Sequence, residues 1–81
     1  MYMDKKLGVV ELDTMATGIR IKTMMEERGI SIRDVSNYMN VSFQAVYRWQ
    51  RGETLPTISN LFVLGQLLGV EVDELLVPKD T

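Results

Sequence analysis

Hydrophobic positions recur every three to four residues over most of the chain, which is the spacing of amphipathic helices. Polar residues that can cap helices precede these stretches, and glycine or asparagine follows most of them. The pattern predicts helices over residues 14 to about 28, 32–39, 43 to about 51, 58–68 and 72–76. We therefore expect a compact all-α, five-helix domain at residues 14–77, followed by a tail at 78–81.

The expected helix ends carry residues that can bond to free backbone groups. N-terminal caps are predicted at Asp13 or Thr14, Ser31, Ser42 and Thr57. Helix stops are predicted at Gly29, Asn40, Gly52 and Gly69, which accept left-handed backbone angles. Ser31 and Asp34 have the spacing of a capping box, with aspartate in place of the usual glutamate.

The predicted core consists of hydrophobic side chains that share one face of each helix. They are Ile21, Met24, Met25, Val35, Met39, Val41, Val46, Trp49, Ile58, Leu61, Leu64 and Leu68. Ser36 is expected where the second and third helices touch, because a close crossing needs a small side chain.

Residues 1–13 form an N-terminal extension with a weaker helical pattern. The stretch from Lys6 to Leu12 is rich in aliphatic residues and contains a glycine, so it fits a short strand as well as an unstructured leader. A lone strand needs a partner, which a second copy of the chain could supply.

Only Met39, Asn40, Val41 and Ser42 join the second and third predicted helices, so these helices must cross at a steep angle. The outer face of the third helix then carries Phe43, Gln44, Tyr47, Arg48 and Arg51. These side chains can stack and hydrogen-bond, unlike the mixture of Glu and Lys that covers a merely solvated helix. Residues 31–51 are therefore the strongest candidate for a binding site.

Composition excludes several classes of function. The 81 residues contain no Cys and no His, which excludes disulfides, Cys or His zinc sites, and catalysis by Ser–His–Asp or Cys–His groups. No apolar run approaches the roughly 20 residues that span a bilayer, and the N-terminus lacks the apolar core of a signal peptide. We expect a cytoplasmic protein that is not an enzyme, has no cofactor or metal, and does not bind membranes.

Residues 18–76 resemble the lambda-repressor-like (Cro and repressor) helix-turn-helix domains. The matching segments are GIRIKTMMEERGIS, RDVSNYMNVSFQAVYRWQRGETLPT and NLFVLGQLLGVEVDELL, in that order. The resemblance implies a five-helix fold that binds double-stranded operator DNA, usually as a homodimer, with the third helix in the major groove.

The resemblance also implies roles for individual positions. Base contacts fall on Phe43, Gln44, Tyr47 and Arg48. Sugar–phosphate contacts fall on Ser42, Arg20, Arg33 and Arg51. Gln can bond the N6 and N7 edge of adenine and Arg the O6 and N7 edge of guanine, whereas phosphate contacts set register without reading sequence.

Four positions depart from the family pattern, and one of them is Asn40, which replaces the usual glycine of the turn. Ile32 stands where the family commonly has a Gln that links a phosphate to the recognition helix, so Arg33 is a candidate replacement for that phosphate contact. Many relatives pair an Arg late in the first helix with a Glu late in the third, and here these positions are Met25 and Gln50. Both charges are lost together, so no unpaired charge is left in a semi-buried place.

The net charge of −2 conceals an uneven distribution. Residues 14–52 carry six basic and three acidic side chains, net +3, whereas residues 70–81 carry one basic and four acidic side chains, net −3. A charge of +3 gives weak, salt-sensitive phosphate binding. A dimer would double the contacts, which favours binding as two copies.

The sequence predicts a sequence-specific transcriptional regulator, with repression of an inverted-repeat operator by a homodimer as the leading hypothesis. The alternative is an antitoxin or mobile-element regulator that also binds a protein partner, a toxin or another regulator, through the N-terminal extension. Two dimer surfaces are candidates, a pair of N-terminal strands or the region of the proline loop and the last two helices. The second candidate surface involves Leu55, Leu75, Leu76 and Val77.

Overall fold

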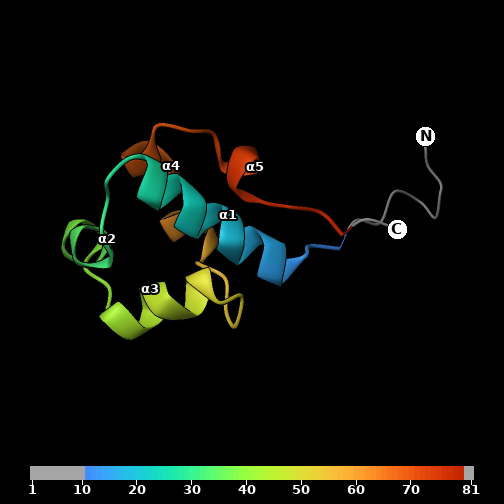
Figure 1. Ribbon diagram of the computed structural model, residues 1–81, viewed down its shortest axis with the longest axis horizontal. Helices are drawn as coiled ribbons and strands as arrows, with labels where there is room; N and C mark the ends of the chain where they lie inside the picture. Colours follow the sequence, from blue (N-terminus) through green and yellow to red (C-terminus); the bar gives the residue numbers. More distant parts are fainter. Residues whose placement is uncertain (1–10, 80–81) are drawn as a thin grey trace.

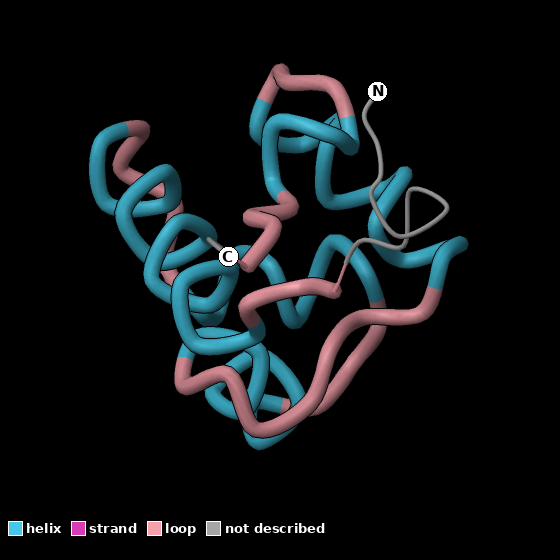
Figure 2. The backbone as a smooth tube through the Cα atoms, turned by 90° about the vertical axis from the view of Figure 1, so that its right-hand side faces the viewer, coloured by secondary structure: helices cyan, strands magenta, loops and turns pink. Residues whose placement is uncertain are grey.

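The computed structural model describes residues 11–79, in which five helices are joined by short loops (Figures 1 and 2). The helices are α1 (Thr14–Glu27), α2 (Ile32–Met39), α3 (Phe43–Gln50), α4 (Ile58–Leu68) and α5 (Val72–Leu75). α1 runs through the middle, with α3 on one side and α5 on the other (Figure 1). The predicted all-α, five-helix architecture is confirmed, and each helix end lies within one residue of its predicted position.

The predicted caps determine these ends. The carboxylate of Asp13 accepts from the amide of Ala16 at 2.9 Å, so Asp13, and not Thr14, caps α1. Ser42 and Thr57 cap α3 and α4 in the same way. Asn40 ends α2 with φ +57°, the one positive φ among the described non-glycine residues.

Most of the predicted core is buried. Ile21, Val35, Val46 and Leu64 are completely inaccessible. Further buried side chains are Met25, Trp49, Leu61, Leu68 and Leu75, and Met24, Met39 and Val41 pack against this cluster.

Two interpretations of helix faces were wrong. Ile58 is 74% exposed. It is the first residue of α4, and among the described residues no element covers that end of the hydrophobic face of the helix. Leu75 is completely buried and therefore cannot line a dimer surface. It faces the core because α5 packs against both α1 and α4.

α1 and α3 approach so closely that their backbones touch at glycine. A Cβ added to Gly18 would lie 2.5 Å from the carbonyl oxygen of Trp49 and 2.6 Å from that of Gln50. A Cβ on Gly52, which has φ +73°, would lie 2.7 Å from the Cα of Met15. Glycine at these two positions allows α3 and the turn after it to lie this close to α1.

The two ends of the described chain pair with each other. Leu12 and Pro78 form an isolated antiparallel bridge. On either side of this bridge, the amide of Asp13 donates to Val77 O at 2.8 Å and that of Lys79 to Glu11 O at 2.7 Å. The strand expected from Lys6 to Leu12 lies mostly outside the described residues, and its described end pairs within the same chain.

Candidate nucleic-acid interface

The corner between α2 and α3 is held by local hydrogen bonds. At its start, the amide of Asp34 donates to Ser31 Oγ at 3.0 Å, and the amide of Ser31 donates to the carboxylate of Asp34 at 2.8 Å. At the turn, the hydroxyl of Ser36 in α2 donates to the carbonyl of Val41, which lies between α2 and α3. The Ser36 hydroxyl thus ties α2 to the turn that leads into α3, a contact that the prediction of a small side chain at this position did not include.

The inner side of α3 is anchored in the core. Val46 is completely buried and Trp49 is 5% exposed, so these two side chains fix which face of α3 points outward. Trp49 is therefore a core residue and is not available to stack on a ligand.

The opposite side of α3 forms an exposed row, which we call the recognition face. It consists of Phe43, Gln44, Tyr47 and Arg48. Phe43 is 44% and Tyr47 54% exposed. Within residues 11–79, the side chains of Gln44 and Arg48 make no hydrogen bond or ion pair, so their donors face solvent.

The residues predicted to contact the sugar–phosphate backbone of DNA lie at different places in the fold. Ser42 lies at the N-terminus of α3, where its hydroxyl is already used as the cap and accepts from the amide of Ala45. Arg51 follows α3 and is paired with Glu53 at 3.1 Å, on a largely exposed surface. Arg33 is exposed in the first turn of α2. Ser42 and Arg51 thus lie at the two ends of α3, whereas Arg33 lies at the start of α2.

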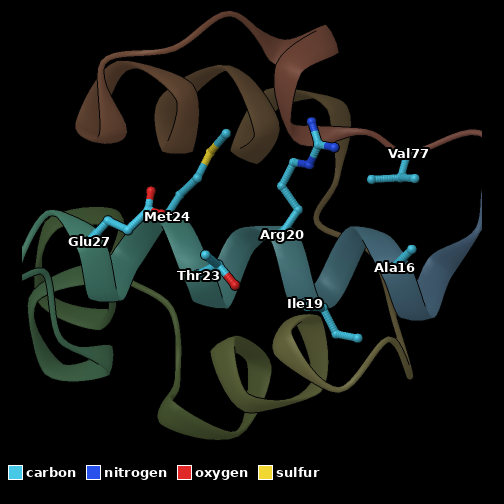
Figure 3. A pocket seen from close by; sticks show the side chains of 7 residues that line it. All are labelled: Ala16, Ile19, Arg20, Thr23, Met24, Glu27 and Val77. Atoms are coloured by element: carbon cyan, nitrogen blue, oxygen red, sulfur yellow. The ribbon is translucent and has the colours of Figure 1, made fainter.

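Arg20 does not lie with the other predicted DNA-contacting residues. Its guanidinium donates to the carbonyl of Glu74 at 2.9 Å, at the end of α5. Figure 3 shows the side chain extending from α1 toward α5, whereas α3 lies on the opposite side of α1. The position of Arg20 in the sequence could not indicate which side of α1 it occupies.

One basic residue that the sequence did not single out lies beside the recognition face. Lys22 is exposed on α1 and shares a cleft of about 260 Å³ with Tyr47 and Gln50. Ser31 and Ile32 from the start of α2 also line this cleft. The signal was present in the sequence, because the excess of basic residues in 14–52 includes Lys22, but its neighbours become apparent only in the folded chain.

The departures from the family pattern are accommodated by packing. Ile32 packs against the hydrophobic core, so it offers no polar group to a ligand. The amide of Gln50 donates to Sδ of Met25 at 3.4 Å, so the two positions that lack the family's charges still contact each other.

The capping box also has an electrostatic effect. The backbone amide of Ser31, followed by its hydroxyl, holds the pKa of the Asp34 carboxyl below its ordinary value. The carboxylate is therefore ionised at neutral pH and lies at the N-terminus of α2, where negative charge is favourable. It belongs to the scaffold of the corner and offers no proton for chemistry.

Two further kinds of feature, a cluster of metal ligands and a membrane-spanning helix, were sought in the described chain. Among residues 11–79, no three Asp or Glu side chains are grouped so that they could hold a metal ion. Over the same residues, every helix is too short or too polar to cross a lipid bilayer.

Comparison with known proteins gives the fold a family. Residues 21–75 match the helix-turn-helix family. No curated protein sequence gives a match. Among solved structures, the c2 repressor of P22 in complex with a synthetic operator is 32% identical, with a TM-score of 0.70 over 74% of this chain and 91% of that one.

Two further structures are similar. SinR, a master regulator for biofilm formation solved in complex with DNA, is 27% identical, with a TM-score of 0.66 over 73% of this chain and 95% of that one. The restriction-modification controller protein C.AhdI from Aeromonas hydrophila is 22% identical, with a TM-score of 0.71 over 78% and 96% of the two chains, and shows the fold alone. The chain thus belongs to the Cro/C1-type helix-turn-helix family of DNA-binding transcription regulators.

Proposed function

We propose that this protein binds double-stranded DNA sequence-specifically as a homodimer and represses transcription by occupying an inverted-repeat operator. The observation that carries the proposal is the recognition face, an exposed row of stacking and hydrogen-bonding side chains on a helix whose other side is anchored in the core. An α-helix fits into the major groove of DNA, where each base pair presents a distinct pattern of hydrogen-bond donors and acceptors.

Each residue of the recognition face has a chemical role in this proposal. Gln44 would bond the N6 and N7 edge of an adenine, and Arg48 the O6 and N7 edge of a guanine. Phe43 would pack against a thymine methyl group. Tyr47 would contact a base edge or the adjacent phosphate, since its position in α3 lies one turn from the N-terminus.

Phosphate contacts would set the register of α3 in the groove. In this proposal the sugar–phosphate backbone would be met by Arg33 at the start of α2, and by Ser42 and Arg51 at the two ends of α3. Lys22 is added to this set because it shares a cleft with Tyr47. Arg20, which the resemblance assigned to the backbone, remains a candidate only if its bond to Glu74 exchanges for a phosphate.

The small charge available for DNA binding supports the proposal of a homodimer. Residues 14–52 carry a net charge of only +3, so a single copy would neutralise few phosphates. Two copies related by a twofold axis would double both phosphate and base contacts and would match the symmetry of an inverted repeat.

The proposal is tested by selecting random duplex DNA on the purified protein at about 0.15 M salt, near physiological ionic strength. The expected result is an inverted repeat whose half-site centres are about one helical turn apart, roughly 10 base pairs. A population without any common sequence would overturn the proposal. Recovery of an isolated half-site would leave sequence-specific binding standing and remove the dimer.

A further inference from the structure

The outward side of α1 carries an apolar groove that the proposed DNA binding does not use. The groove has a volume of about 370 Å³, and Val77, from the segment after α5, forms one edge of it. Ile19 in the groove is 57% exposed, and Met15, one turn before it, is 66% exposed. The residues of α1 that line the groove are Ala16, Ile19, Arg20, Thr23, Met24 and Glu27 (Figure 3).

The chain enters the domain at one end of this groove. The carbonyl of Val77 accepts from the amide of Asp13 at 2.8 Å, and the amide of Lys79 donates to the carbonyl of Glu11 at 2.7 Å. The carboxylate of Asp13 in turn accepts from the amide of Ala16, where the groove begins. Residues 1–10 therefore join the described chain beside Ala16 and Val77.

We propose that residues 1–10 bind in this groove of the same chain, with their apolar side chains against Ile19 and its neighbours. Six of these ten residues are apolar, namely Met1, Tyr2, Met3, Leu7, Val9 and Val10. Apolar side chains gain free energy when they leave water for an apolar surface. The inference goes beyond the proposed DNA binding and does not depend on it.

The segment is long enough to follow the groove. Glu27 lies 11 residues after Ala16 in the same helix, a distance of about 17 Å along the axis. The chain runs from residue 11 into α1, so the segment has to reverse its direction to lie along this helix. Gly8 suits such a reversal, because glycine accepts backbone angles that other residues avoid. The residues before Gly8 span up to about 23 Å when extended, so they reach Glu27.

Tether, size and charge favour this segment over a second copy or another protein. Attachment beside the groove gives the segment an effective concentration of about millimolar. A groove of about 370 Å³ holds a few side chains, whereas a stable protein–protein interface buries about 800 Å² on each partner. The groove contains Arg20 and Glu27, and the segment contains Asp4, Lys5 and Lys6, so each charge in the groove can meet an opposite one.

The test is disulfide trapping in the full-length chain, which has no cysteine of its own. Met3→Cys is combined with Thr23→Cys in the groove, and in the control protein with Thr54→Cys. Thr54 is also an exposed threonine, and it lies two residues after Gly52, whose backbone lies against Met15 near the start of α1. The control cysteine is therefore on the side where the segment joins the domain, but outside the groove.

The pair with Thr23→Cys should form its disulfide within one chain on the order of tenfold faster than the control pair, because bound residues 1–10 raise the local concentration of the first cysteine at the groove. Adding Leu7→Asp should reduce this rate to that of the control, since a charge resists transfer to an apolar surface. The helical circular-dichroism spectrum should not change, because Leu7 lies outside the described domain.

Three results would overturn the inference. The first is an equal rate for the two cysteine pairs, and the second is a rate for the Thr23→Cys pair that Leu7→Asp leaves unchanged. The third is a disulfide that joins two chains, visible by non-reducing electrophoresis, because the groove would then be filled by another copy. None of these measurements involves DNA, so they leave the proposed function to its own test.

Discussion

Gln50 of α3 donates its side-chain amide to the sulfur of Met25 in α1 at 3.4 Å. Met25 is 2% exposed and Gln50 is half-buried, so this contact between α1 and α3 lies on the inner side of α3. Many relatives carry an arginine and a glutamate at these two positions. In this chain a polarisable thioether and a neutral amide meet there, and neither requires a charge to be buried.

This contact makes a double-mutant cycle informative. Met25→Arg alone should lower the free energy of unfolding by about 3–5 kcal/mol, because it places an unpaired charge in a buried site. Adding Gln50→Glu should recover part of that loss, with a favourable coupling of about 0.5–3 kcal/mol. Urea denaturation of the two single variants and the double variant measures the coupling. Additive losses would show that the two positions do not form a pair.

Helix propensity alone would predict that Gly18→Ala stabilises the protein, but the backbone contact at Gly18 predicts that it destabilises it. Alanine in an exposed helix would stabilise relative to glycine by about 0.5–1 kcal/mol. At Gly18 a Cβ would meet the carbonyl oxygens of Trp49 and Gln50, which belong to backbone and cannot rotate away. Gly18→Ala should therefore destabilise the protein by about 1–3 kcal/mol in thermal or urea denaturation.

Thr23→Ala, at an exposed position of the same helix, is the control for Gly18→Ala. It should change the free energy of unfolding by no more than about 0.5 kcal/mol. A stabilised Gly18→Ala variant would show that a Cβ at position 18 does not clash with the carbonyl oxygens of Trp49 and Gln50.

The capping box predicts a specific pH dependence. The pKa of Asp34 is lower in the folded chain than its ordinary value of 3.8, so ionised Asp34 favours the folded state. Its contribution is fully present above about pH 4 and is lost as the pH falls through the folded-state pKa. The difference in unfolding free energy between wild type and Asp34→Asn should therefore shrink from pH 7 to pH 3. A difference that is constant over this range would contradict the assignment.

Arg48 and Arg51 should differ in what they contribute to DNA binding. Arg48→Ala should weaken the free energy of DNA binding by about 1–3 kcal/mol and relax the preference at one base position, because the side chain is proposed to read a guanine. Arg51→Ala should weaken binding to all sequences alike and reduce the salt dependence. Competition binding against operators changed at single positions distinguishes the two. A uniform loss for Arg48→Ala would make it a phosphate contact.

Local chemistry explains why the helix ends could be predicted from the sequence. Ser31, Asp34, Asn40 and Ser42 act on backbone groups within a few residues, so their roles do not depend on the rest of the fold. The recognition face also followed from periodicity, because burial of Val46 and Trp49 requires the opposite side of α3 to be exposed.

Features that depend on distant elements could not be predicted in this way. Ile58 fits the periodic stripe of α4, yet its exposure depends on where the neighbouring helices end. Arg20 is positioned by its bond to Glu74, 54 residues further along the chain. Leu75 is buried because the short α5 folds back between α1 and α4, which its four residues alone do not indicate.

If the recognition face reads base edges, exchanging two of its residues should change the DNA sequence that the protein prefers. The variant Gln44→Arg/Arg48→Gln keeps the composition and net charge of the protein unchanged. Parallel selections of random duplex DNA on wild type and variant should yield inverted repeats with the same half-site spacing but different preferred bases, with adenine and guanine preferences altered at the positions that these residues face. Recovery of the same sequence by both proteins would show that the recognition face does not determine specificity.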